Sequence, residues 1–174
     1  MLGCIFATQV VAQGTSGLSE DKLARLLDGL SNGADAPEGE LTSFQAFRQI
    51  RKLDKTPDKI IERAICLAVS RDSHKRVPAR LLLETATLNV QQVSQLIDAV
   101  GTIDERKSQY AYSLDRETKR WARWISKPGQ IATATLQRLA EDETKTPEQR
   151  ALARAGLDSI EPTRGTKDER GTSR

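Results

Sequence analysis

Apolar residues recur every three to four positions along most of this 174-residue chain, with polar residues between them. This spacing is typical of amphipathic helices. One apolar set falls on a single side of a helix that begins after Ser19: Leu23, Leu26, Leu27 and Leu30. The stretch NVQQVSQLIDAVG predicts another helix, with Asn89 as the N-terminal cap and Gly101 as the stop. No segment alternates with period two for long enough to predict a strand.

The same periodicity predicts about eight helices in all. The others are expected over 43–53, over 57–69 with Thr56 as cap, from Pro78 onward, over 104–126, over 131–142 and over 147–160. In the last helix, Thr146 and Gln149 have the spacing of a capping box. Further side chains are expected in the core: Phe44, Phe47, Ile50, Cys66, Leu81, Leu82 and Leu88.

The fold class predicted is therefore all-α, with one helical domain over 19–160. At 174 residues the chain suffices for one domain with a substantial core. Beyond Ile160 the stretch EPTRGTKDERGTSR has no large apolar residue, so residues 161–174 are expected to be a disordered charged tail.

The last two helices resemble a HEAT-type helical repeat. Five residues of 136–160 match the spacing of the second helix of that repeat: Arg150, Ala153, Gly156, Leu157 and Ile160. A looser match within 67–86 has the same spacing: Arg76, Ala79, Leu82, Leu83 and Ala86. The segment 89–127 does not fit the repeat. Two architectures stay open, a short HEAT-like α-solenoid fragment and an irregular helical bundle.

Composition and motifs argue against several kinds of chemistry. The chain has 27 Lys and Arg, 24 Asp and Glu, and a formal net charge of +3, well short of a strongly cationic nucleic-acid binder. It contains two cysteines and one histidine, His74, interpreted as a loop residue. Neither a metal-ligand set nor a nucleophile, phosphate-loop or zinc-protease motif is present. We therefore expect a non-catalytic protein without a cofactor.

The most distinctive local feature is the stretch DRETKRWARWISK. At 100° per residue its cations fall on one stripe, here called the cationic ridge: Arg116, Lys119, Arg120, Arg123 and Lys127. The opposite side carries Tyr110, Leu114, Trp121 and Ile125, and Trp124 lies near the boundary. Three interpretations stay open: a solvated face of a half-buried helix, an anion-binding or acidic-partner surface, and a membrane-interfacial helix.

The first 17 residues carry no charge. Val10 and Ala12 have the spacing that a signal peptidase accepts, which predicts cleavage before Gln13, although no Lys or Arg precedes the apolar run. Residues 1–12 are thus interpreted either as the remnant of a signal peptide, with a periplasmic or secreted protein, or as a buried arm of a cytoplasmic one. The function expected is a protein-binding or scaffold module; the alternative is a nucleic-acid- or anion-binding protein that uses the cationic ridge, Trp124 included.

Overall fold

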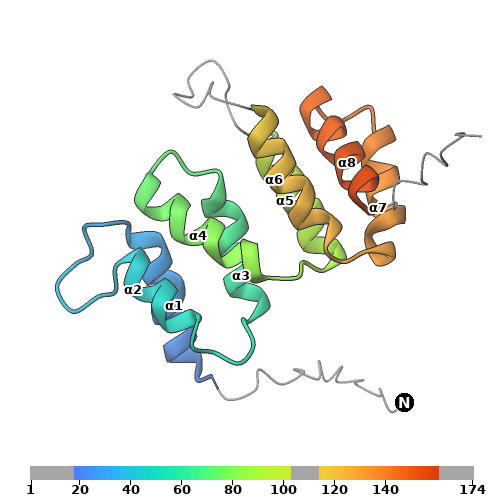
Figure 1. Ribbon diagram of the computed structural model, residues 1–174. Coiled ribbons are helices and arrows are strands. Elements are labelled where there is room, and N and C mark those ends of the chain that lie inside the picture. The colour runs from blue at the N-terminus through green and yellow to red at the C-terminus, as the bar shows by residue number, and fades with distance from the viewer. Residues whose placement is uncertain (1–17, 103–113, 161–174) are drawn as a thin grey trace, which may run out of the picture.

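The computed structural model describes residues 18–102 and 114–160, and within these ranges it is all-helical and contains no strand (Figure 1). This confirms the all-α prediction. The described helices are α1 (Glu20–Asn32), α2 (Ser43–Ile50), α3 (Asp58–Ala68), α4 (Ser73–Thr85), α5 (Val90–Val100), α6 (Leu114–Ser126), α7 (Gln130–Glu141) and α8 (Pro147–Ile160). The predicted leader 1–12, the tail 161–174 and the first part of the predicted helix 104–126 lie outside the described residues.

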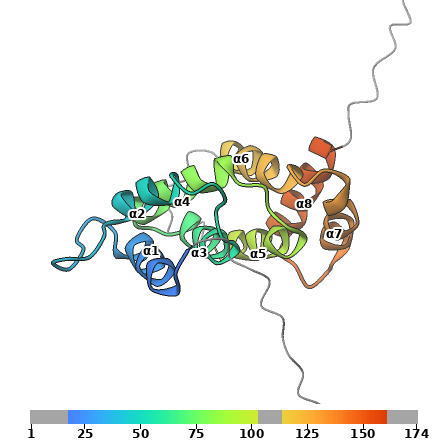
Figure 2. The same cartoon turned by 90° about the horizontal axis from the view of Figure 1, so that it is seen from below.

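The helices stand in two rows, as Figure 2 shows. Along one row α1 packs on α3, α3 on α5 and α5 on α7, while along the other α2 packs on α4 and α6 on α8. Side chains of α4 and α6 also meet, so that the second row is continuous. Helices that follow one another in the chain pair between the rows: α1 with α2, α3 with α4, and α7 with α8. The buried apolar side chains form one cluster, from Leu26 on α1 to Ala153 on α8.

The approach of α1 to α2 depends on small residues. A Cβ atom added at Gly29 would lie 2.8 Å from the Cβ of Leu41 and 2.9 Å from that of Ala46. Ser43, fully buried, donates through Oγ to the Leu30 carbonyl at 2.9 Å and accepts from the Gly33 amide at 2.9 Å. The first turn of α2 is therefore fastened to the end of α1.

Most of the predicted helix starts are confirmed. Ser19 accepts from the Lys22 amide, and Asn89 and Thr146 exchange hydrogen bonds with Gln92 and Gln149. In α3 the N-cap position is Pro57 rather than Thr56. Helix α4 begins at Ser73, capped by Asp72, so Pro78 lies inside the helix and the prediction that it marks the entry was wrong.

Side chains from neighbouring helices satisfy carbonyls at helix C-termini. Arg80 of α4 donates to the Ala68 carbonyl at the end of α3, at 2.9 Å. Arg154 of α8 donates to the Ala140 carbonyl near the end of α7, at 3.4 Å. Gln149 of α8 donates to the Ile97 carbonyl of α5, at 3.2 Å. Because the last carbonyls of a helix have no partner within it, these contacts tie the helices together at their ends.

Three of the expected core residues are exposed instead. Because Ser43, Ala46 and Ile50 occupy the buried side of α2, Phe44 points outward and is 39% exposed. The buried side of α4 is set by Arg76, Ala79, Leu82 and Leu83, and Leu81 on the opposite side is 42% exposed. Cys66 also lies at the surface, on the polar side of α3.

Candidate functional site

Helix α6 carries the cationic ridge, and its two tryptophans face the core. Trp121 is 2% exposed and Trp124 is fully buried, as is Ile125 beside them. The structure thus places Trp124, one of the candidate binding residues, in the core and not at the surface with the ridge cations. The interpretation as a membrane-interfacial helix loses its aromatic anchors for the same reason.

The middle of the cationic ridge is engaged in ion pairs with carboxylates. Arg120 lies 3.5 Å from Glu84 of α4 and 3.5 Å from Glu117 of its own helix. Glu117 in turn forms a 2.8 Å ion pair with Arg80 of α4, whose guanidinium lies 6.0 Å from the Trp121 ring centre. Burial lowers the pKa of Arg80, which Glu117 opposes. These pairs join α4 to α6 and leave less charge for a ligand.

Lys127 closes the C-terminus of α4. Its Nζ donates to the carbonyls of Leu83 at 3.0 Å, Glu84 at 2.6 Å and Ala86 at 3.0 Å. An ammonium group at the negative end of a helix dipole is a favourable arrangement. Burial lowers the pKa of Lys127 and the Glu84 carboxylate opposes that shift. The contacts assign Lys127 a structural task.

The remaining ridge cations are Lys119, Arg123 and Arg116, and the structure describes the side chains of the first two only. Lys119 and Arg123 are exposed on α6. Arg116 lies in the first turn of α6, and its side chain falls outside the described atoms. The structure thus brings Arg120 and Lys127 to α4 and leaves Lys119 and Arg123 at the surface, so that the ridge does not form one uniform stripe.

A group of exposed apolar side chains on α2 and α4 was not predicted from the sequence. Four large apolar residues are exposed in the described ranges, and three of them belong to α2 and α4: Phe44 at 39%, Val77 at 41% and Leu81 at 42%. We call these three the apolar strip. Val77 and Leu81 are one helical turn apart and point the same way. The fourth, Ile131, is 76% exposed on α7.

The apolar strip and the surface cations lie on one side of the row α2, α4 and α6. We call this the α2–α4–α6 face, defined by its exposed members Phe44, Arg48, Arg51, Val77, Leu81, Glu84, Lys119 and Arg123. Arg51 lies over the ring of Phe47, 5.9 Å from its centre. The face combines an apolar middle with arginines at both margins, an arrangement common at protein-binding surfaces.

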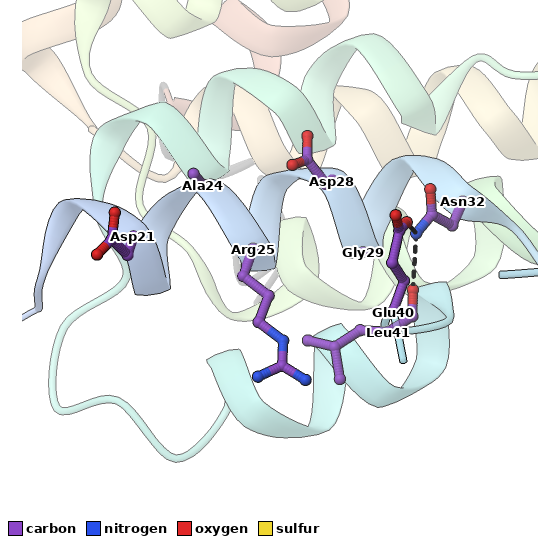
Figure 3. A pocket seen from close by; sticks show the side chains of 8 residues that line it. All are labelled: Asp21, Ala24, Arg25, Asp28, Gly29, Asn32, Glu40 and Leu41. Carbon is purple, nitrogen blue, oxygen red and sulfur yellow. Dashed lines mark hydrogen bonds between the residues drawn. The ribbon is translucent and has the colours of Figure 1, made fainter. Parts of the chain in front are cut away.

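A hollow lies between α1 and the loop that follows it, drawn in Figure 3. It encloses about 300 Å³ and is lined by Asp21, Ala24, Arg25, Asp28, Gly29, Asn32, Glu40 and Leu41. Asn32 donates to the Glu40 carboxylate at 2.9 Å and to the Leu41 carbonyl at 3.0 Å, so the loop is held to α1 by its own contacts. No side chain of this hollow has the arrangement of a nucleophile with a base.

No set of three or more His, Cys, Asp or Glu side chains in 18–102 and 114–160 is grouped closely enough to bind a metal ion. None of the helices described there has the length and apolar character to span a bilayer. His74, expected in a loop, lies exposed in the first turn of α4, where its amide donates to Asp72.

Comparison of the chain with protein-family models, with curated proteins and with solved structures gave no match.

Proposed function

We propose that this chain is a non-catalytic binding module whose partner is another protein, bound on the α2–α4–α6 face. The observation that carries the proposal is the apolar strip, because three of the four exposed large apolar side chains of the described residues lie on two adjacent helices. Single exposed apolar residues are ordinary at a protein surface, whereas a group rimmed by charged residues is typical of an interaction site.

The distribution of charge supports a protein partner over a nucleic acid. Two of the ridge cations, Arg120 and Lys127, make their contacts within the chain. A nucleic-acid backbone needs cations spaced along a continuous path, and on this face Val77 and Leu81 interrupt it. An aliphatic surface with arginines at its margins is better matched by a protein.

We further propose that the helices form a short HEAT-like α-solenoid fragment. Support comes from Arg80 and Arg154, which stand at the same position from the start of α4 and α8. Each donates to a carbonyl near the end of the preceding helix. A Cβ atom added at Gly156 would lie 2.7 Å from Cδ1 of Ile125 of α6, in keeping with a small residue between successive pairs. Helices α5 and α6 stand in the corresponding places of the two rows (Figure 2).

The experiment is isolation of the tagged full chain from the cells that make it, after mild crosslinking, with quantification of the co-isolated proteins. The test variant is Arg48→Glu/Arg51→Glu/Arg123→Glu, which reverses three exposed charges of the face. The matched control is Arg63→Glu/Arg138→Glu, which changes exposed arginines of α3 and α7 in the other row. Both variants alter surface residues, so both are expected to fold.

We expect a defined partner with the wild-type chain and with the control, and its loss with the test variant. Partners unchanged in the test variant contradict the assignment of the surface. Material that disappears after nuclease treatment assigns the face to nucleic acid instead.

A further inference from the structure

The apolar strip crosses the boundary between α2 and α4. Gly33 exchanges hydrogen bonds with Ser43 at the start of α2, its amide donating to Oγ and its carbonyl accepting from the Ser43 amide. A Cβ atom added at Gly33 would lie 3.0 Å from the Asp72 carboxylate and 3.2 Å from Cε of Lys75, at the start of α4. The first turns of α2 and α4 are therefore neighbours, which brings Phe44 to the level of the early turns of α4.

The rotation of α2 turns Phe44 toward α4. Gln45 and Gln49 are exposed on one flank of α2. This flank faces away from α4, at the end of the row where α2 has no further neighbour among the described helices. Phe47 on the other flank is half-buried and packs against the core. At 100° per residue, Phe44 lies on the flank of Phe47. The outer side of the α2–α4 boundary is thus lined by Phe44 and Phe47 from one helix and by Val77 and Leu81 from the other.

Positive charge lies on both sides of this boundary. Arg48 on α2 and Arg51 at its C-cap are exposed, and Arg123 is exposed on α6, on the far side of α4. The one exposed carboxylate among the described residues of the face, Glu84, lies 3.5 Å from Arg120. In contrast, acidic and basic side chains alternate on the exposed sides of α1 and α3. The exposed charges of the α2–α4–α6 face are therefore predominantly positive, whereas those of α1 and α3 are of both signs.

We infer that the occupant of this boundary is an acidic amphipathic helix of a partner protein, an inference that rests on the proposed function. Its apolar side, repeating at i, i+3, i+4 and i+7, covers Phe44, Val77 and Leu81. Its carboxylates, on the two margins of that side, meet Arg48 and Arg51 on one flank and Arg123 on the other.

The charge of the face also argues against a second copy of the chain bound through the same face. A symmetric contact would bring Arg48, Arg51 and Arg123 of each copy to the same predominantly positive face of the other, and like charges across an interface are unfavourable. The occupant must bring the opposite charge, together with apolar side chains for the strip.

The test is titration of the full chain with designed helical peptides of known composition. The first peptide has Leu at the i, i+3, i+4, i+7 positions and Glu at their margins. The second keeps the Leu residues and has Lys in place of Glu, and the third keeps Glu and has Ser in place of Leu. Dissociation constants come from fluorescence anisotropy, and the site comes from backbone amide shifts of the labelled chain.

We expect the first peptide to bind more tightly than the other two by about tenfold or more, with shifts at α2 and α4. Val77→Ser/Leu81→Ser and Arg48→Glu/Arg51→Glu should each weaken it by about tenfold or more, and only the second variant should flatten the salt dependence. The controls Ile131→Ser and Arg138→Glu, in exposed positions of α7, should leave binding unchanged.

Equal binding of the Glu and Lys peptides overturns the inference, as does binding that the Val77→Ser/Leu81→Ser variant retains. Failure of the first peptide to bind below about 1 mM also overturns it. Vesicles with anionic lipids form a separate arm; binding to them with no response to the peptides assigns the face to a membrane surface. If the charge-reversed chain loses its native partner but the wild-type chain does not bind the first peptide, the proposed function is retained and the acidic helix is rejected.

Discussion

Arg80 of α4 and Glu117 of α6 form a 2.8 Å ion pair that joins two helices of the same row. The pair is informative because it shows that charged side chains of α6 are paired with side chains of α4 within the fold. Glu117 also lies 3.5 Å from Arg120, so one carboxylate serves guanidinium groups from both helices. A helix whose sequence suggests a uniform cationic side is thus partly neutralised by its own fold, and the exposed apolar side chains next to it become the more informative feature.

Replacement of Lys127 by Met removes the three hydrogen bonds that its ammonium group donates to the end of α4. Because the carbonyls then lose their partner while the methylene packing is kept, we expect the free energy of unfolding to fall by about 1–3 kcal/mol. The measurement is urea denaturation followed by circular dichroism. Arg123→Met, in the last turn of α6, is the control, with an exposed side chain and an expected change within about 0.5 kcal/mol. Equal effects of the two substitutions contradict the capping contact.

Gly29→Ala tests the close approach of α1 and α2. In an isolated helix the change favours stability by about 1 kcal/mol. Here the new Cβ lies 2.8 Å from that of Leu41 and 2.9 Å from that of Ala46, and neither neighbour is a flexible chain end. We expect a net destabilisation of about 1–3 kcal/mol in thermal or urea unfolding. The double variant Gly29→Ala/Ala46→Gly should recover part of that loss, and a stabilised single variant would contradict the packing.

The two tryptophans provide a direct spectroscopic readout of the position of α6. Trp121 and Trp124 are buried, and their indole N–H groups have no hydrogen-bond partner among the described atoms. We expect blue-shifted fluorescence emission and little quenching by iodide in the folded chain. Trp124→Ala should lower the free energy of unfolding by about 3–5 kcal/mol. Ready quenching of the folded chain would contradict the burial of this side of the helix.

Acid should weaken the turn between α7 and α8. The Thr144 hydroxyl and amide donate to Asp142 at 2.6 and 2.9 Å, and they hold the pKa of that carboxyl below its ordinary value of 3.8. A carboxylate with a lowered pKa stabilises the fold above its ordinary value, and this contribution is lost as the pH falls through the lowered one. Asp142→Asn should therefore be less stable than the wild type at neutral pH and equal to it in strong acid.

Urea denaturation at a series of pH values measures this difference. Glu148 at the start of α8 adds in the same direction, since hydrogen bonds from its backbone amide and from Thr146 lower its pKa. Asp35→Asn, an exposed loop substitution, is the control. A difference between Asp142→Asn and the wild type that stays constant down to strong acid would count against the contact.

The all-α fold class and most helix starts could be predicted from the sequence because they depend on local chemistry. Ser19, Asn89 and Thr146 satisfy amides within their own first turn, which the sequence shows directly. The start of α4 was wrongly predicted at Pro78 because the helix, capped by Asp72, tolerates a proline in its second turn.

The rotation of a helix about its axis could not be predicted in the same way. Ser43 is buried through contacts with Leu30 and Gly33 in the preceding helix and loop, and this long-range pairing turns Phe44 outward. Similarly, a helical projection places Arg120 and Lys127 on the cationic ridge but cannot show their partners at α4, more than thirty residues earlier in the chain. The apolar strip was not predicted because Phe44 and Leu81, as large apolar residues of amphipathic helices, were assigned to the core.

The most direct measurement of the central claim is photo-crosslinking in the cells that make the protein, with benzoylphenylalanine at Leu81 in one variant and at Ile131 in another. Both side chains are exposed, at 42% and 76%, and they lie on α4 and α7 in opposite rows. We predict a discrete protein adduct from position 81 that disappears with Arg48→Glu/Arg51→Glu, and no such adduct from position 131. Equal adducts from both positions, or none from position 81, would contradict a protein-binding α2–α4–α6 face.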